Sequence, residues 1–251
     1  MATPSSVLKV QVWRGQRQGA YQTFEVPRQA NQTVLDVVTH IQRRQDPTLS
    51  YRFACRVGMC GSCAMQVNGV ARWTCRTHVS KVCVDSQLQL APLSNLPVVK
   101  DLVVDMDSFF EKMQQARGRF VGEHTRHEPV ALVKPTSAAR QAADAGIECI
   151  GCAICYSSCD VVTWRPEFMG PAALNRAWTL LNDERDVDRR ERLVAVSGDA
   201  GCHSCHTQGS CTLRCPKDLA PTLAIAGLKR MSARAAMRGE LDLEPTAKEA
   251  S

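Results

Sequence analysis

The spacing of its cysteines restricts the fold of this chain more than any other feature. There are 13 cysteines among 251 residues, and because that number is odd they cannot all pair as disulfides within one chain. The first residues lack the basic, apolar and small-residue regions of a signal peptide, so we expect a reducing compartment in which clustered thiols bind metal. Three groups of four cysteines stand out, with Cys83 alone between the first two: Cys55, Cys60, Cys63 and Cys75; Cys149, Cys152, Cys155 and Cys159; Cys202, Cys205, Cys211 and Cys215.

Composition and charge exclude several classes of protein. Hydrophobic residues make up 44% of the chain and charged residues 22%, as in globular proteins that bury a core. The net charge of +6 is spread along the sequence and not gathered in a basic stripe, so we expect no nucleic-acid partner. No apolar run approaches the roughly 18 residues that a membrane-spanning helix requires.

The first cysteine group has the spacing of a plant-type [2Fe–2S] site, in which three thiolates come from one short loop. Gly58 and Gly61 let that loop curl and bring backbone N–H groups toward the sulfurs. A zinc site is the alternative, but zinc ligand pairs usually have two to four residues between them and recur as matched pairs. The spacing therefore favours a [2Fe–2S] cluster with these ligands: Cys55, Cys60, Cys63 and Cys75.

Short alternating segments surround this loop. Thr33 and Asp36 give a weak capping-box signal for a helix, and Asn68-Gly69 suits a type I′ turn between two strands. Alternation of apolar and polar residues predicts strands over residues 7–13, 21–26, 64–67, 70–74 and 87–90. Together these elements indicate a small α+β sheet wrapped on one helix.

The second cysteine group has the spacing of a bacterial ferredoxin run, whose fourth cysteine ligates the other of two clusters. A second run has the same steps at Cys205, Gln208, Cys211 and Cys215, and Pro216 completes its ending. With the fourth cysteines exchanged, one cluster is predicted to be [4Fe–4S], with the ligands Cys149, Cys152, Cys155 and Cys215. The other cluster keeps only three thiolates, from Cys159, Cys205 and Cys211.

Gln208 stands where the fourth ligand of that last cluster would be. Because three thiolates hold three irons, the sequence predicts a [3Fe–4S] cluster. The alternative is that Gln208 or an outside ligand holds a fourth iron, although an amide oxygen is a hard ligand and a poor match for this soft site. Cys202 lies outside the repeat and is predicted to be a buried thiol, while Cys83, in an apolar strand-like stretch, is predicted to pack in a core.

Outside the cysteine groups, the second half of the chain is predicted to be helical. Apolar residues at helical spacing predict helices over residues 101–117, 171–195 and 219–232. The charged run at 183–192 is predicted to be a solvent-exposed face, and residues 239–251 a polar, frayed tail.

Five stretches of the sequence carry a specific resemblance. They are CRVGMCGSC at 55–63, DMDSFF at 105–110, CIGCAICYSSC at 149–159, FMGP at 168–171 and CTLRCPKDLAP at 211–221. With the order of the cysteine groups, they resemble the iron–sulfur subunit of succinate dehydrogenase and fumarate reductase (respiratory complex II) over about residues 5–235. The resemblance implies a β-grasp plant-type ferredoxin domain over residues 1–104, an all-α bacterial-ferredoxin-like domain over 105–238, and a polar tail over 239–251.

That resemblance implies an electron-transfer subunit of the respiratory chain and the tricarboxylic acid cycle. In the family, a flavoprotein subunit with covalently bound FAD interconverts succinate and fumarate, and electrons pass between FAD and a quinone through the three clusters. The implied partners are the flavoprotein, membrane anchor subunits and the quinone. The implied location is peripheral, on the cytoplasmic side of the inner membrane through the anchor. The chain itself offers no general base, nucleophile or dinucleotide motif, so we expect no catalytic residue in it.

The resemblance also implies two residues near the quinone, Trp164 and His206. An indole N–H can donate a hydrogen bond to a quinone carbonyl, and an imidazole can donate one or relay a proton. The alternative for Trp164 is a core aromatic, and either role buries its ring. The chain departs from the family at Asp160, Val161 and Gln208, where proline, serine and a small or apolar residue are common, so the quinone pocket is expected to differ in detail.

Three other functions stay open at the level of sequence. One is the iron–sulfur subunit of a soluble fumarate reductase-like complex with a non-quinone electron partner, which would lack a neighbouring gene for a membrane anchor. Another is a free-standing ferredoxin, which predicts a stable monomer with an acidic surface. The third is a zinc-stabilised interaction module, which would be colourless where an iron–sulfur protein is brown.

Overall fold

The computed structural model describes residues 7–123, 127–129 and 131–241, and the chain divides into two compact units. The N-terminal unit comprises Met1–Phe110, Ile150–Cys159 and Leu213–Asp218. The helical unit comprises Glu111–Cys149, Asp160–Thr212 and Leu219–Ser251. Two short segments from the second half of the sequence, both bearing cysteines, therefore belong to the N-terminal unit.

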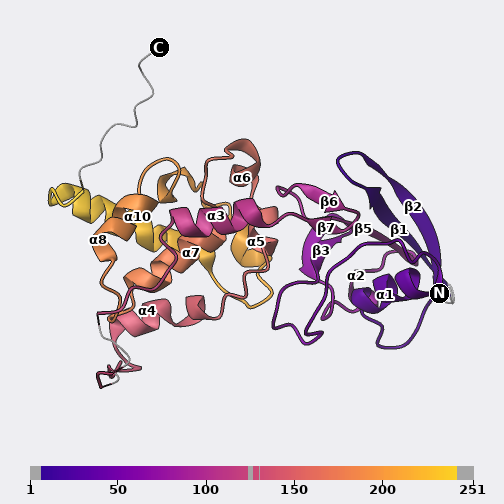
Figure 1. Cartoon of the computed structure of the whole chain (residues 1–251), viewed down its shortest axis with the longest axis horizontal. Helices are drawn as coiled ribbons and strands as arrows, with labels where there is room; N and C mark the ends of the chain where they lie inside the picture. The colour runs from indigo at the N-terminus through magenta and orange to yellow at the C-terminus, as the bar shows by residue number, and fades with distance from the viewer. Residues whose placement is uncertain (1–6, 124–126, 130, 242–251) are drawn as a thin grey trace, which may run out of the picture. The chain divides into compact units, whose positions relative to one another are not determined.

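A five-stranded mixed sheet forms the body of the N-terminal unit (Figure 1). Its strand order is β2-β1-β5-β3-β4, with β1 and β5 parallel and the other neighbours antiparallel. The strands are β1 (Val7–Gly15), β2 (Gly19–Pro27), β3 (Ala64–Val67), β4 (Val70–Trp73) and β5 (Gln87–Ala91), and all five confirm strands predicted from alternation.

Local sequence signals explain how this unit starts and turns. The Thr33 side chain accepts from the backbone N–H of Asp36, whose carboxylate accepts from that of Thr33, so the capping box before α1 (Val34–Arg44) is confirmed. Asn68 and Gly69 have φ of +50° and +73° between β3 and β4, as a type I′ turn requires. The apolar face of α1 is fully buried and packs in one core with inward residues of β1, β2, β3 and β5.

Two smaller elements complete the unit. The short helix α2 (Val79–Val82) precedes Cys83, which is half-buried and packs against the sheet core as predicted, although its extended backbone caps a helix and does not continue a strand. The strands β6 (Val98–Lys100) and β7 (Val103–Val104) form a separate ribbon.

The helix predicted over residues 101–117 is shorter than expected, because its first part belongs to that ribbon and α3 covers only Asp107–Gln115. Asp101, with φ +52°, is buried, and its carboxylate accepts from the backbone N–H groups of Gly15 and Ser50. Those bonds tie residue 101 to two distant segments, so the apolar residues that follow it pack as a strand.

The helical unit is built around α7 (Gly170–Leu181), which is buried along most of its length and packs against α10 (Pro221–Met237) and α4 (Ala138–Ile147). The remaining helices of the second half are α5 (Ile154–Ser157), α6 (Asp160–Trp164), α8 (Arg189–Val196), α9 (Ser210–Leu213) and the 3₁₀ turn η1 (Cys202–Ser204). The helix predicted over 219–232 is α10, whereas the helix predicted over 171–195 is interrupted between α7 and α8.

A buried arginine accounts for that interruption. The Arg192 side chain is fully buried and donates to both carboxylate oxygens of Asp186, at 2.5 and 3.1 Å. Its remaining N–H groups reach the backbone carbonyls of Arg117 and Arg119, both at 2.9 Å. The prediction that the whole charged run is solvent-exposed is therefore wrong at these two residues, because the segment between the helices turns inward to pair them.

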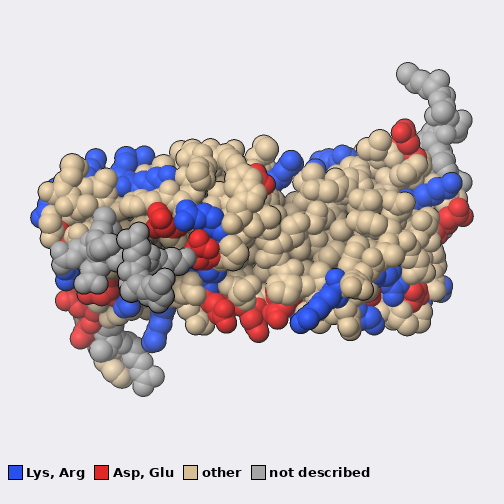
Figure 2. Space-filling model, turned by 90° about the horizontal axis from the view of Figure 1, so that it is seen from above, with Lys and Arg blue, Asp and Glu red and all other residues tan. Residues whose placement is uncertain are grey.

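Charge is otherwise distributed as the sequence predicts. Figure 2 shows Lys and Arg side chains interspersed with Asp and Glu over the face in view, without a continuous basic stripe. Within the part of the chain that the structure describes, no helix combines the length and the hydropathy needed to cross a bilayer. The predicted tail is described only to Leu241, which is buried, and the rest of it lies outside the described residues.

Arg192→Leu should destabilise the chain by about 3–5 kcal/mol, because it leaves the Asp186 carboxylate buried without its partner. The matched control is Arg190→Leu, an exposed arginine on the same helix, for which we expect a change within about 0.5 kcal/mol. Denaturant unfolding of the two variants beside the wild-type chain measures both values. Equal, small losses would mean that the Arg192 pair does not stabilise the fold.

Candidate metal centres

Three thiols of the first cysteine group lie on the tightly curled loop before β3. Backbone N–H groups of Met59 and Cys60 donate to the Cys55 sulfur at 3.2 and 3.3 Å, and the N–H of Cys55 approaches the Cys60 sulfur at 3.5 Å. Donors aimed at sulfur stabilise a thiolate, which is the form that binds iron. The predicted role of this loop therefore has a physical basis in its backbone.

The fourth thiol, Cys75, reaches this loop from beyond β4. Burial, hydrogen bonding to the Cys63 thiol and the charges of Cys63 and Cys55 together raise its pKa to about 12, against one N–H donor from Gly58. For Cys60, burial also opposes ionisation, but hydrogen bonds from Ser62 and from the backbone of Cys55 and Ser62 outweigh it and lower the pKa to about 6. The structure thus brings all four predicted [2Fe–2S] ligands into one cluster of interacting thiols.

The fit to a multi-iron cluster rests on these contacts. Gly58 has φ +75°, and a Cβ there would lie 2.8 Å from the Trp73 ring, so the curl of the loop needs glycine at this point. Four thiols, converging N–H donors and the absence of bulk at Gly58 fit a [2Fe–2S] group.

The first ferredoxin run curls through two left-handed residues. Gly151 has φ +62° and Ala153 φ +59°, immediately before α5. For alanine this conformation costs about 1–2 kcal/mol, so the fold must hold it in place. The result is that Cys152 and Cys155 lie on either side of one tight turn, as ligands of a common cluster need to.

Asn95 holds the end of that run. Its amide Nδ2 donates to the backbone carbonyls of Tyr156 at 3.1 Å and Cys159 at 3.2 Å, at the end of the short helix α5 and just beyond it. The backbone N–H of Ser94 donates to the Ser157 hydroxyl at 2.9 Å. Sequence analysis missed this contact, because nothing near residue 95 indicates a partner more than 60 positions away.

The second ferredoxin run lies mostly in the helical unit. Cys211, on α9, is buried and its sulfur lies 3.3 Å from the Thr222 hydroxyl; burial raises its pKa against that hydrogen bond. Lys229 of α10 donates to the backbone carbonyl of Cys205 at 2.6 Å. The first turns of α10 thus hold two of the three thiols predicted to bind the three-iron centre.

The remaining cysteines and Gln208 are placed as follows. Cys202 is fully buried, as predicted, and burial raises its pKa to about 11. Gln208 is exposed between Thr207 and Gly209, which both have positive φ. Cys215 belongs to the same unit as Cys152, Cys155 and Cys159, whereas Cys149 belongs with Cys205 and Cys211 to the helical unit.

Trp164 and His206, the two residues implied near a quinone, lie in the helical unit. Arg165 connects the segments that carry them. Trp164 ends α6 and its side chain is 65% exposed, so the alternative of a core aromatic, and the expectation of a ring buried within this chain, are wrong. Arg165 donates to the Ser204 hydroxyl at 2.8 Å, two residues before the exposed His206. Sequence analysis missed Arg165, since an isolated arginine carries no recognisable pattern.

Comparison with known protein families gives two matches in order along the chain. A 2Fe-2S iron-sulfur cluster binding domain matches residues 7–111, and a 4Fe-4S dicluster domain matches residues 148–220.

Individual relatives agree with these domains. The mitochondrial succinate dehydrogenase [ubiquinone] iron-sulfur subunit 1 of Oryza sativa is 37% identical over 80% of this chain and 72% of its own. The fumarate reductase iron-sulfur subunit of Mycobacterium tuberculosis is 33% identical over 92% of this chain and 94% of its own. Among solved structures, a chain of the Mycobacterium smegmatis Sdh1 complex in the apo form has a TM-score of 0.81 at 28% identity, covering 96% of this chain and 99% of its own.

Asn95→Gly should loosen the segment from Tyr156 to Cys159, because glycine keeps the left-handed backbone (φ +65°) but removes the amide donor. Each lost hydrogen bond is worth about 0.5–1.5 kcal/mol, so faster amide hydrogen exchange is expected in peptides covering this segment. Asn31→Gly, at an exposed asparagine with φ +57°, is the matched control. If both variants exchange at the wild-type rate there, Asn95 does not hold the run in place.

Proposed function

The chain belongs to the family of iron–sulfur subunits of succinate dehydrogenases and fumarate reductases, and from this premise we propose which of its residues hold clusters and where electrons leave it. It is an electron-transfer subunit with a 2Fe-2S and a 4Fe-4S dicluster domain. The dicarboxylate reaction takes place on the partner subunit. The single observation that carries the residue assignment is the convergence of four thiols and their N–H donors beside β3 and β4.

We assign the three groups of ligands as the spacing indicates. The [2Fe–2S] cluster takes Cys55, Cys60, Cys63 and Cys75; the [4Fe–4S] cluster takes Cys149, Cys152, Cys155 and Cys215; the [3Fe–4S] cluster takes Cys159, Cys205 and Cys211. When bound, these groups supply one-electron carriers. The assignment of Cys215 to the same cluster as Cys152 and Cys155 is supported by the fold, because Leu213–Asp218 and Ile150–Cys159 belong to one compact unit.

The corresponding architecture is a β-grasp plant-type ferredoxin domain over residues 1–104, an all-α bacterial-ferredoxin-like domain over 105–238 and a tail over 239–251. The mixed sheet with α1 packed on it supports the first name. The layer of α4, α7 and α10 supports the second. The compact units differ from these sequence bounds because the sheet unit extends to Phe110 and includes two cysteine-bearing segments, Ile150–Cys159 and Leu213–Asp218.

The partners we propose are an FAD-containing flavoprotein subunit, membrane anchor subunits and a quinone. The relatives are named as subunits of succinate dehydrogenase and fumarate reductase, and the structural neighbour comes from an Sdh1 complex. We place the chain on the cytoplasmic side of the membrane, attached through the anchor. A tryptophan that is 65% exposed is unusual for a side chain of this size, and burial against such a partner would remove its apolar surface from water.

Electrons leave, in this proposal, beside Trp164 and His206. Trp164 ends α6, which begins at the residue after Cys159, and His206 follows Cys205 directly. Arg165 joins the two segments through Ser204 and also lies 3.7 Å from the Asp199 carboxylate. The indole N–H can donate to a quinone carbonyl, and the imidazole can supply the proton that quinone reduction needs with each electron.

Gln208→Cys should let the third centre bind a fourth iron, because it restores the thiolate missing from the repeat. The electron paramagnetic resonance signal of an oxidised three-iron centre should disappear from the assembled complex. Cys202→Ser, which removes a buried thiol outside the repeat, should keep that signal. The ligand assignment fails if the Gln208 variant has an unchanged spectrum, or if the Cys202 variant loses the signal.

Trp164→Leu and His206→Ala should each slow quinone reduction while succinate oxidation with an artificial flavin-level acceptor stays near the wild-type rate. His203→Ala is the matched control, since its ring lies 3.2 Å from the Ser232 hydroxyl, on α10. We expect the control to reduce quinone normally. Parallel loss of both activities in the test variants would show that they maintain the fold or a cluster, and no loss of either would show that electrons leave the chain elsewhere.

A further inference from the structure

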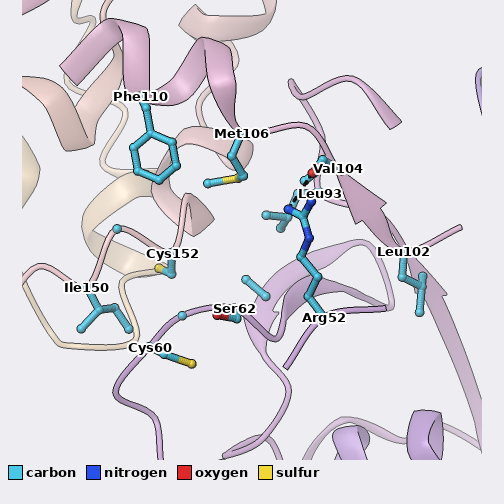
Figure 3. A pocket seen from close by; sticks show the side chains of 13 residues that line it. Arg52, Cys60, Ser62, Leu93, Leu102, Val104, Met106, Phe110, Ile150 and Cys152 are labelled. Carbon is cyan, nitrogen blue, oxygen red and sulfur yellow. Dashed lines mark hydrogen bonds between the residues drawn. The ribbon is translucent and has the colours of Figure 1, made fainter. Parts of the chain in front are cut away.

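The loop that carries the [2Fe–2S] ligands faces the start of the first ferredoxin run within the N-terminal unit. Cys60 and Ser62 lie opposite Ile150 and Cys152 (Figure 3). Residues of both segments line a cavity of about 230 Å³, and Arg52, whose guanidinium donates to the carbonyl of Val104 at 2.9 Å, forms part of its wall. Each of the two segments supplies ligands to a different proposed cluster.

At one residue the two segments come into direct contact. Gly61 is buried, and a Cβ placed on it would lie 2.6 Å from the Cβ and 2.8 Å from the Cα of Cys152. Both distances are shorter than any that real Cβ atoms show, and one of the atoms met is backbone. A side chain of any size at residue 61 would therefore push Cys152, or its own loop, away.

We propose that Gly61 is a positioning residue that sets the separation between the [2Fe–2S] and [4Fe–4S] ligands. Its missing side chain lets the backbone between Cys60 and Cys63 rest on Cys152 with nothing in between. This inference rests on the ligand assignment proposed above. The step it serves moves one electron, so that one centre is oxidised and the other reduced, and no bond is formed or broken.

Two other glycines of these loops also have a positive φ, but a Cβ on either of them would not meet the opposite segment as it would at Gly61. Gly61 has φ +72°, so any side chain there also strains the backbone. Gly151, beside Cys152, has a similar φ of +62°, but a Cβ there meets nothing within 4 Å. Gly58 has φ +75°, and its Cβ would meet Trp73 and Arg76, on its own side of the contact.

The far end of the ferredoxin run is held independently. Asn95 and Ser94 hydrogen-bond to the segment from Tyr156 to Cys159, so this part of the run has its own attachment to the sheet unit. A side chain at residue 61 would thus change the spacing at Cys152 without releasing the run. For that reason the Gly61→Ala variant is expected to keep both clusters.

The test compares two alanine variants, Gly61→Ala and Gly151→Ala, in the complex assembled with its partners. When both centres are reduced and paramagnetic, a close [4Fe–4S] centre speeds the spin relaxation of the [2Fe–2S] centre, an effect that falls steeply with distance. Gly61→Ala should keep the iron content of the wild type but lose much of this enhancement, seen as saturation of the [2Fe–2S] signal at lower microwave power. Gly151→Ala, which strains the backbone beside Cys152 without meeting any atom within 4 Å, should keep the enhancement.

Several results would overturn the proposal. Unchanged relaxation in Gly61→Ala would show that residue 61 does not set the spacing. Loss of the [2Fe–2S] cluster itself in that variant would assign Gly61 to cluster binding, and equal loss of enhancement in Gly151→Ala would assign the effect to backbone strain. The proposed function is tested separately by the wild-type complex, which must show both reduced signals whatever the variants do.

Discussion

The structure depends on bringing thiolates that lie far apart in sequence onto compact inorganic clusters. Thiolates on one cluster repel each other, so each site needs N–H donors aimed at sulfur and a backbone that curls tightly enough to supply them. The donors from Met59 and Cys60 and the left-handed residues Gly58 and Ala153 meet both needs. Within the N-terminal unit the mixed sheet and α1 support the first loop, and within the helical unit the packing of α7 on α10 supports the segments of the second run.

Where local chemistry decides the structure, the sequence was sufficient to predict it. The capping box at Thr33, the Asn68-Gly69 turn and the alternation in β1 each act over a few residues, and each is confirmed. Predictions failed where the bounds of a helix depend on a charged residue that hydrogen-bonds to a distant segment of the chain. Asp101 and Arg192 both make buried hydrogen bonds with segments far away in the chain. The bonds of Asp101 delay the start of α3, and those of Arg192 turn the segment between α7 and α8 inward.

The same distinction between local and distant interactions applies to the candidate sites. Ligand identity follows from spacing, because each cluster takes most of its thiolates from one short run. The residues that hold the runs in place do not follow from it. Asn95, Arg165 and Gly61 each act on a segment at least 39 positions away, through an amide, a guanidinium or the absence of a side chain, and none of these leaves a periodic pattern. The exposure of Trp164 could not be predicted either, since a surface that awaits a partner has the composition of a core.

We propose that this one chain holds three different iron–sulfur clusters with eleven cysteine ligands. Mössbauer spectroscopy of the complex, labelled with iron-57 and assembled with its partners, tests it most directly, because it counts iron by cluster type. We expect iron in the proportions two to four to three, for the [2Fe–2S], [4Fe–4S] and [3Fe–4S] centres. Two four-iron centres and no three-iron centre, or a chain that holds zinc in place of iron, would contradict it.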